Sequence, residues 1–300
     1  MRISVYIYPI FLFLIFSASP LYSKELPDWM KPLPIDPELL RPAVPEGFVL
    51  VKGGCFQMGD TFGDGENDEK PVHEVCVDDF YMGKYEVTVG EFREFVNTTG
   101  YRTEAEQGDG CFVLTGSKWE KDRNKNWRNL DFSQDDRHPV ACVSWNDAQE
   151  YIRKLNEKFP LNKGGQGVVY RLPTEVEWEY AARSGGKNEK YAGGNDLDSV
   201  GWYNDNSGGK THPAGQKKPN GLGLYDMTGN VWEWVQDWYD ENYYKNSPKD
   251  NPRGASSGQS RVLRGGSWVD DAMGPRAANR NWDNPGNRNY FNGFRVARTK

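Results

Sequence analysis

The sequence predicts a single α+β domain with little regular secondary structure, spanning about residues 46–300. Three observations predict this fold class. The 300 residues include 33 glycines and 18 prolines, which interrupt regular elements. Three stretches have helical apolar spacing, whereas short apolar runs of strand length are frequent. Aromatic residues form 14% of the chain, enough to pack a core although apolar residues form only 37%.

The N-terminal segment predicts export. Arg2 precedes the apolar run Ile3–Phe16, and small residues follow up to Ser23, so residues 1–23 are expected to be a signal peptide. The run is shorter than the roughly 20 residues of a membrane span, which disfavours an anchor. Residues 24–45 are Pro-rich and are expected to form an extended leader. We therefore expect a periplasmic or extracellular mature chain without a transmembrane span.

Strands and one capped helix are expected in the first part of the domain. Four apolar runs predict short strands: Phe48–Val51, Cys55–Gly59, Val72–Val77 and Phe80–Tyr85. The acidic loop Asp60–Lys70 is expected to be simply solvated. Thr88 is a candidate N-cap for a helix that buries Phe92 and Phe95.

Two more helices are expected further along. One spans Asp147–Lys158 and is capped by Ser144 or Asn146. The other follows Thr174, with Glu177 placed as in a capping box. Strand-like runs precede them at Pro139–Trp145 and Tyr170–Glu175. Residues 100–136 and 184–300 lack periodicity, so the first is expected to be a long loop and the second irregular but packed.

Charge and histidine content exclude several functions. The chain carries 37 basic and 43 acidic residues, without a basic run, which excludes a general nucleic-acid binder. Its three histidines argue against a site with several histidine ligands. We expect His73 and His138 to make structural hydrogen bonds.

The four cysteines, Cys55, Cys76, Cys111 and Cys142, predict disulfides because the chain is expected to be exported. Of the three possible pairings we favour Cys55–Cys76 with Cys111–Cys142, which joins neighbouring segments. The absence of a CxxC spacing disfavours a metal-binding or catalytic thiol.

Several motifs together resemble the formylglycine-generating enzyme family, also called the sulfatase-modifying factor family, over about residues 46–298. The resemblance implies a compact variant of the C-type lectin fold. The motifs that carry it are Gly53–Gly59, Pro71–Val75, Tyr85–Thr88, Val143–Trp145, Arg171–Glu179, Gly229–Trp234, Arg264–Trp268 and Gly293–Arg295.

A calcium site is expected at the turn that includes Asp226 and Glu233. These carboxylates, with the carbonyls of Gly229 and Val231, offer the hard oxygens that calcium prefers. The resemblance implies a structural calcium site here, with Asp226 where the family usually carries Asn. The alternative is a solvated acidic turn. The resemblance implies a second, poorer match near Trp202–Gly209.

The same resemblance predicts that the chain is not a formylglycine-generating oxidase. The family's oxidases bind Cu(I) through two cysteines after the Gly-Gly-Ser motif, since soft thiolates select Cu(I). Residues 269–276 contain no cysteine, and none follows Cys142 anywhere in the chain. Copper is therefore not expected. A family enzyme with another oxidative chemistry, of the non-haem metal or periplasmic maturation type, remains an alternative.

The C-terminal segment 270–292 is dense in Asn, Asp, Arg and Tyr, which suit an adaptable binding surface. It resembles the variable region of lectin-fold proteins diversified by retroelements. The candidate ligand-surface residues are Asp270, Asp271, Asn281, Asn289, Tyr290 and Asn292. Alternatively, four arginines in and around this segment, Arg264, Arg276, Arg280 and Arg295, pair with acidic residues inside the domain, which we prefer for Arg295.

The function predicted from the sequence is an exported, calcium-stabilised binding module. Its C-terminal surface is expected to recognise an unidentified protein or glycan. Three alternatives remain: the family enzyme with another chemistry, a retroelement-diversified ligand binder, and a structural part of an envelope assembly.

Overall fold

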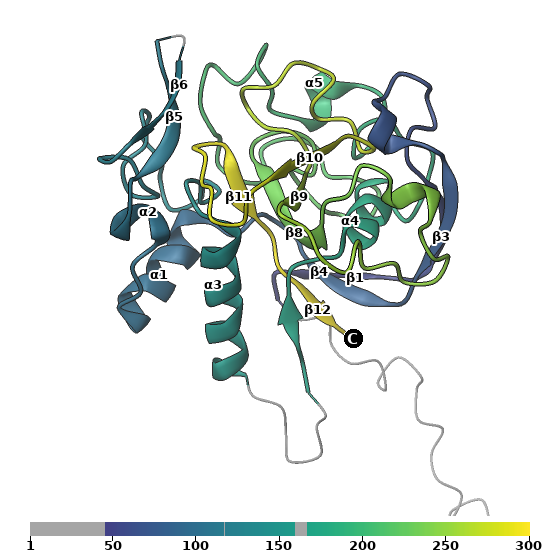
Figure 1. The fold of residues 1–300 in the computed structure, drawn as a ribbon, viewed down its shortest axis with the longest axis horizontal. Coiled ribbons are helices and arrows are strands. Elements are labelled where there is room, and N and C mark those ends of the chain that lie inside the picture. Colours follow the sequence, from purple (N-terminus) through teal and green to yellow (C-terminus); the bar gives the residue numbers. More distant parts are fainter. Residues whose placement is uncertain (1–45, 117, 160–166) are drawn as a thin grey trace, which may run out of the picture. The chain divides into compact units, whose positions relative to one another are not determined.

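The computed structural model describes residues 46–116, 118–159 and 167–300 (Figure 1). The predicted signal peptide 1–23 and leader 24–45 lie outside the described residues. Within the described part, no helix is long and apolar enough to cross a membrane.

One four-stranded antiparallel sheet joins the two ends of the domain. Its order is β1-β4-β12-β7, and β12 pairs with both β4 and β7. The C-terminal strand thus lies inside the sheet, between β4 and β7, while the first strand forms one edge (Figure 1). The strands are β1 (Phe48–Val51), β4 (Phe80–Gly83), β7 (Tyr170–Arg171) and β12 (Ala297–Thr299).

A second four-stranded sheet, of order β10-β9-β8-β11, carries the C-terminal segment. In it β11 runs parallel to β8, while the other pairs are antiparallel. Its strands are β8 (Trp232–Trp238), β9 (Arg261–Arg264), β10 (Arg280–Asp283) and β11 (Asn292–Phe294). Two separate hairpins complete the strands: β2 (Gly54–Met58) with β3 (His73–Val77), and β5 (Cys111–Thr115) with β6 (Lys118–Asp122).

Capping boxes start the main helices. Thr88, Ser144 and Thr174 each accept a hydrogen bond from the backbone three residues later, where an acidic side chain bonds back. These are the caps expected from the sequence, and of the two candidates for the helix before Lys158 it is Ser144, not Asn146, that forms the cap. The helices are α1 (Val89–Thr99), α2 (Glu104–Gln107), α3 (Trp145–Lys158), α4 (Glu175–Ala182) and α5 (Leu197–Val200), with 3-10 turns η2 (Asn67–Glu69) and η3 (Tyr243–Lys245).

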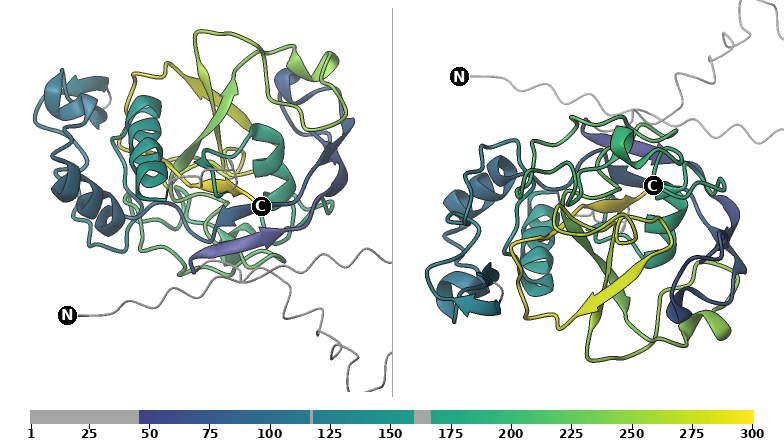
Figure 2. Two further views of the ribbon diagram at one scale, coloured as in Figure 1. Left: turned by 90° about the horizontal axis from the view of Figure 1, so that it is seen from below. Right: turned by 90° about the horizontal axis from the view of Figure 1, so that it is seen from above.

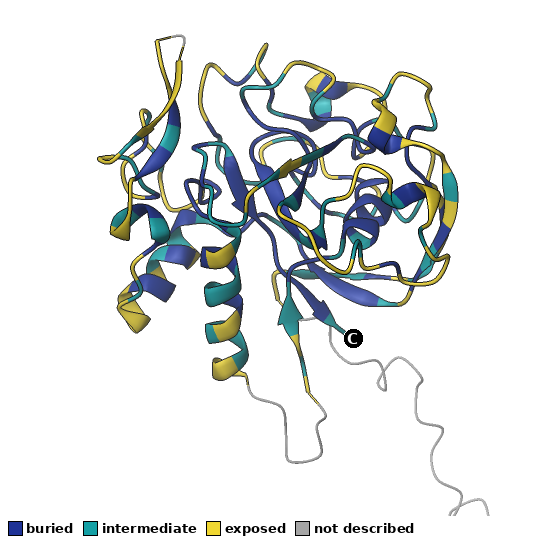
Figure 3. Ribbon diagram, in the orientation of Figure 1, coloured by how far each residue is buried: buried dark blue, intermediate teal, exposed yellow. Residues whose placement is uncertain are grey.

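The core is aromatic, as the composition predicts. One cluster lies between α4 and the strands beside it and includes Trp178, and another lies under α1 and α3 and includes Trp127 and Trp234. All three indoles are at most 1% exposed. Figure 2 shows α3 and α4 on either side of the central strands, and Figure 3 shows how much irregular chain is buried as well.

Both expected disulfides are confirmed. Cys55–Cys76 joins directly paired residues of β2 and β3, and Cys111–Cys142 joins β5 to the segment before α3. Each pair is close in sequence, with separations of 21 and 31 residues.

Two expectations about secondary structure were wrong. Pro139–Trp145 is not a strand, because Val140 N donates to Val87 while Cys142 N donates to Asn289. Its backbone therefore bonds to two different segments instead of one ladder. Conversely, residues 100–136 are not one long loop, since they contain α2, β5 and β6. Strand β6 gave no signal because its side chains do not alternate between buried and exposed.

The loop Asp60–Lys70 is not simply solvated. Asp60 accepts backbone hydrogen bonds from four residues, 62 to 65, and folds the loop around its carboxylate. Glu69 is fully buried and forms a bidentate pair with Arg276 at 2.7 Å for each bond. The acidic residues of this loop are therefore structural.

Candidate functional site

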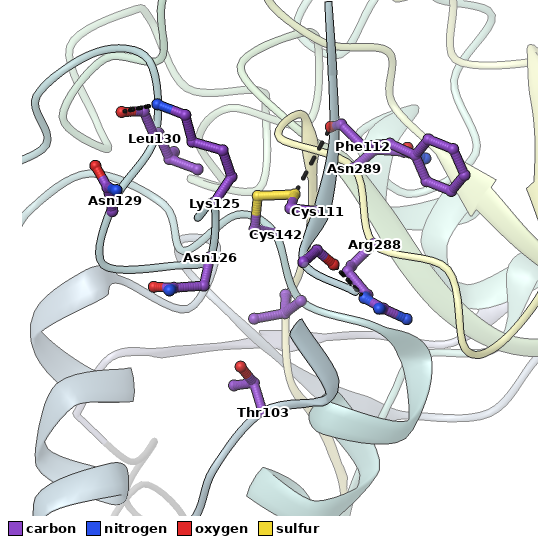
Figure 4. The surroundings of a disulfide bond; sticks show 12 residues. Thr103, Cys111, Phe112, Lys125, Asn126, Asn129, Leu130, Cys142, Arg288 and Asn289 are labelled. Atoms are coloured by element: carbon purple, nitrogen blue, oxygen red, sulfur yellow. Dashed lines mark hydrogen bonds between the residues drawn. A yellow bond between two sulfur atoms is a disulfide. The ribbon is translucent and has the colours of Figure 1, made fainter. Parts of the chain in front are cut away.

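The C-terminal segment lies along the β5–β6 hairpin. Phe112 N donates to Arg288 O at 2.9 Å, and Tyr290 N donates to Phe112 O at 3.1 Å. Cys142 N donates to Asn289 O at 3.1 Å, next to the Cys111–Cys142 disulfide (Figure 4). Hairpin, disulfide and C-terminal segment thus form one unit, which we call the hairpin surface (residues 111–116, 118–122, 131–132, 268–271 and 281–291).

Aromatic rings fill the base of the hairpin surface. Tyr290 packs edge-on against Trp268, with ring centroids 4.9 Å apart, and Phe132 packs on Trp268 at 5.2 Å. Trp119 covers Tyr290 and Phe291 at 5.7 and 5.4 Å. Trp119 remains 51% exposed. The sequence alone predicted no role for Trp119, although Gly116 between two runs of strand length is the signal that would indicate this hairpin.

Side-chain amides lie around Asp283, the last residue of β10. Asp283 accepts hydrogen bonds from the side-chain amides of Asn287 and Asn289, at 2.7 and 2.9 Å. Asn281 lies two residues before Asp283 and therefore on the same face of β10. All of these side chains are partly exposed, so they offer donors and acceptors to solvent.

An arginine lies opposite this amide group. Arg261 and Asp283 are backbone partners in the antiparallel β9–β10 ladder. Its guanidinium lies 3.9 Å from the ring centroid of Trp145 and 3.4 Å from that of Trp238. Burial lowers the pKa of Arg261 to about 10. The guanidinium is therefore held by two indoles and remains cationic at neutral pH.

The six expected ligand-surface residues do not share one environment. Asp271 is exposed, and Asp270, Asn281 and Asn289 are partly exposed. Tyr290 and Asn292 are 5% and 0% exposed, which corrects the expectation that they face a ligand. They are buried because Tyr290 supports the aromatic base and Asn292 pairs with Trp232 in the β11–β8 ladder.

Asp270 also has a structural task. Its Oδ2 accepts hydrogen bonds from Ser267 N at 2.8 Å and Ser267 Oγ at 2.6 Å. Burial raises the pKa of Asp270 above its usual value. Of the two neighbouring acids, Asp271 is the more exposed, and its Oδ1 accepts a hydrogen bond from Met273 N at 2.9 Å.

Arg264, Arg276, Arg280 and Arg295 are buried inside the domain. This confirms the expectation for Arg295. The expectation that arginines of this region contribute to a binding surface is wrong for these four. Each of the four is at most 6% exposed and pairs with a buried glutamate. The pairs are Arg264–Glu179, Arg276–Glu69, Arg280–Glu175 and Arg295–Glu233. Such pairs form because a buried charge without a partner is costly.

The expected calcium segment lies in a buried charged centre. Glu233 accepts hydrogen bonds from Arg295 at 2.6 and 2.7 Å and from Trp178 Nε1 at 2.8 Å. Asp226 Oδ2 accepts from Gly215 N at 2.6 Å, whereas its Oδ1 is buried with no partner among the described residues. Burial raises the pKa of Asp226 to about 6.

Glu86 belongs to the same centre, although the sequence reading missed it. It is 1% exposed and accepts hydrogen bonds from Asn230 Nδ2 at 3.0 Å and Val231 N at 3.3 Å. Burial and the charges of Asp226 and Glu233 raise the pKa of Glu86 well above its usual value. Three carboxyl groups thus surround the single guanidinium of Arg295.

This centre fits a cation in part. The unpartnered Asp226 oxygen and the excess of carboxyl groups favour one, whereas Glu233 is already bound by Arg295 and Trp178. Among the described residues, no group of three or more His, Cys, Asp or Glu side chains is arranged to hold a metal ion. The expected ligand set differs from such a group, since it contains two carboxylates, Asp226 and Glu233, and two backbone carbonyls. Gly229 is required at this turn, since a Cβ there would lie 2.0 Å from Trp202 O.

The histidines make structural hydrogen bonds, as we expected for His73 and His138. His73 Nδ1 lies 3.0 Å from Pro71 O, and His138 Nδ1 lies 3.0 Å from Thr211 Oγ1. His212 Nε2 lies 2.8 Å from Ser207 O. Burial lowers the pKa values of His138 and His212.

These features define a mixed α+β domain of the C-type-lectin-like class, with low regular secondary structure, buried ion pairs and two disulfides. Comparison with known families makes this specific. Residues 38–300 match the sulfatase-modifying factor enzyme 1-like domain, so the chain belongs to the sulfatase-modifying factor family.

The similar proteins include one named as a formylglycine-generating enzyme and one named as inactive. The formylglycine-generating enzyme of Streptomyces coelicolor is 36% identical over 266 residues, which cover 76% of this chain and 81% of the relative. The inactive C-alpha-formylglycine-generating enzyme 2 of Bos taurus is 33% identical over 297 residues, which cover 83% and 87%. Among solved structures, Treponema denticola variable protein 1 superposes with a TM-score of 0.65 at 27% identity, covering 84% of this chain and 95% of that protein.

Proposed function

We propose that this chain is an exported binding module of the sulfatase-modifying factor family that does not generate formylglycine. The observation that carries the proposal is the state of its cysteines. All four cysteines of the sequence are joined in two disulfides, and none lies in the C-terminal half. No thiolate pair is left to bind Cu(I) as the resembling oxidases do. The proposal is supported by the relative from Bos taurus whose name describes it as inactive.

The hairpin surface supports the binding part of the proposal. It combines a half-exposed indole with partly exposed amides and a carboxylate on a backbone held by a disulfide. Rigid aromatic groups beside adaptable hydrogen-bonding groups are what binding surfaces use. The ligand is a protein or a glycan.

Calcium is proposed as a structural ion rather than a catalytic one. The buried, unpartnered Oδ1 of Asp226 would be one ligand, and the carbonyls of Gly229 and Val231 would be others. Its charge would offset the excess of carboxyl groups around Arg295. Copper has no place in this proposal.

An activity assay tests the first part. The mature chain is incubated with Cu(I), oxygen and a cysteine-containing sulfatase peptide, beside the Streptomyces coelicolor enzyme as positive control. Mass spectrometry is expected to show formylglycine with the control only. Formylglycine formed by this chain would refute the proposal.

An array of glycans and envelope proteins tests the second part. Binding is expected to weaken in Asn281→Ala and Asn289→Ala, which remove amides from the hairpin surface. Gln57→Ala, which removes an exposed amide from β2, is the matched control. Binding that none of the surface variants alters would show that this surface is not the site.

A further inference from the structure

The β5–β6 hairpin presents two large apolar side chains to solvent. Leu114 and Trp119 are direct partners in the antiparallel ladder, so they share one face, and they are 41% and 51% exposed. Figure 1 shows the hairpin projecting from the body of the domain. Exposed apolar residues alone are common, so their surroundings decide what they do.

Trp119 is held in a defined orientation. The rings of Tyr290 and Phe291 meet it at interplanar angles of 79° and 89°. Tyr290 is itself buried against Trp268, and the hairpin below is tied by the Cys111–Cys142 disulfide. The indole therefore loses little conformational freedom when a ligand packs on it, which favours binding.

Polar groups lie next to this indole. The backbone of Asn289 forms an isolated parallel β-bridge with Phe112. Phe112 lies on the same face of the hairpin as Leu114 and Trp119. The Asn289 amide is anchored on Asp283, and the ammonium of Lys121 lies 5.0 Å from the Phe112 ring centroid. The hairpin surface thus combines the Trp119 indole with an amide, a carboxylate and the ammonium of Lys121, which also pairs with Asp109 at 2.7 Å.

We propose that Trp119 is the stacking platform of a saccharide-binding subsite on the hairpin surface. A pyranose ring has an apolar C–H face that packs on an indole, and hydroxyl groups around its edge that both donate and accept hydrogen bonds. The ring would cover Trp119, and its hydroxyl groups would meet the Asn289 amide, Asp283 and Lys121. This inference rests on the proposed binding function and names its ligand class.

The size of the patch favours a sugar over a protein. A specific protein interface uses about 20 to 30 residues a side around an apolar core. Among the described residues of the hairpin surface, the exposed large apolar side chains are only Leu114, Trp119 and Trp282. The other strand positions of β6 are charged, which discourages addition of a peptide strand at this edge.

Saturation-transfer NMR with the mature, disulfide-bonded chain tests the inference. The probes are trisaccharides of glucose, mannose, galactose and N-acetylglucosamine. We expect at least one to receive saturation, and Trp119→Ala to weaken its binding about tenfold or more. Trp119→Phe, which keeps an aromatic face, is expected to retain part of the affinity. Phe62→Ala, at a 41% exposed ring outside the hairpin surface, is the matched control and should bind as the wild type.

Because Trp119 packs on two rings, Leu114→Ala is measured as a second variant that leaves the indole in place, and it too should weaken binding. Equal binding by the wild type and both hairpin variants would overturn the inference. If no trisaccharide binds while proteins on the array bind through Asn281 and Asn289, the saccharide inference fails and the binding function stands. If neither class binds, both fail.

Discussion

Asp237 is a buried carboxyl group without an ion pair among the described residues, and its replacement should change how stability depends on pH. It is 2% exposed, and Glu175 N donates to its Oδ2 at 2.9 Å. Burial, followed by the negative charge of Glu175, raises the pKa of Asp237 to about 8. Asn at this position would accept the same hydrogen bond and carry no charge.

The sign and size of the effect follow from linkage. In the unfolded chain the pKa of Asp is about 3.9, so at pH 6 to 8 the unfolded state has lost the proton that the folded state keeps. Each pH unit in this window then lowers the free energy of unfolding by about 1.4 kcal/mol. Between pH 6 and pH 8 the wild type should lose about 2 to 3 kcal/mol through Asp237. For a domain of this size that is on the order of 4 to 12 °C in Tm.

Thermal melts followed by circular dichroism, with both disulfides intact, measure this. The Tm difference between Asp237→Asn and the wild type should grow in favour of the variant as the pH rises from 6 to 8. Asp60→Asn is the control of opposite sign. Burial raises the pKa of Asp60, but four backbone N–H donors outweigh burial and lower it overall. Its stabilisation should be present at neutral pH and disappear on acidification. Parallel Tm curves for Asp237→Asn and the wild type would refute the reasoning.

Three further outcomes are expected. Glu175→Gln leaves the buried Arg280 without its charged partner and should cost about 3 to 5 kcal/mol in the free energy of unfolding, measured by urea denaturation; a loss below about 1 kcal/mol would show that the pair is dispensable. Mild reductant should open Cys55–Cys76 first, since Cys55 is exposed whereas both cysteines of Cys111–Cys142 are buried; alkylation and peptide mass spectrometry would show the order, and simultaneous opening would contradict it. Elemental analysis should find calcium without stoichiometric copper or iron, and chelation should lower Tm in the wild type but not in Asp226→Ala; stoichiometric copper or iron would favour the enzyme alternative.

Local signals explain which elements were predictable. Each main helix begins at a Ser or Thr whose side chain bonds three residues ahead, and this information lies within four residues of sequence. The disulfide pairing was also predictable because each pair joins neighbouring segments. Strand β8 was not, since its run Trp232–Trp238 buries Glu233 and Asp237 along with its tryptophans. A strand with buried charges has no alternating pattern to find.

The candidate site was predictable in outline but not residue by residue. The density of Asn and Asp pointed to the C-terminal segment, and Asp271, Asn281 and Asn289 do reach solvent. Tyr290 and Asn292 have the same composition signal yet are buried. Trp119, a half-exposed ring of the hairpin surface, lay in a region that had no periodicity.

By itself, the sequence determined the family, the α+β class, the helix caps and the two disulfides, because motifs, caps and cysteine spacing are short-range features. Only the tertiary structure decided which polar residues face solvent. Arg276, Arg280 and Arg295 look like surface residues until their partners are found 207, 105 and 62 positions away. Burying a charge is favourable only beside its counter-charge, and that partner is brought near by the fold of the whole chain.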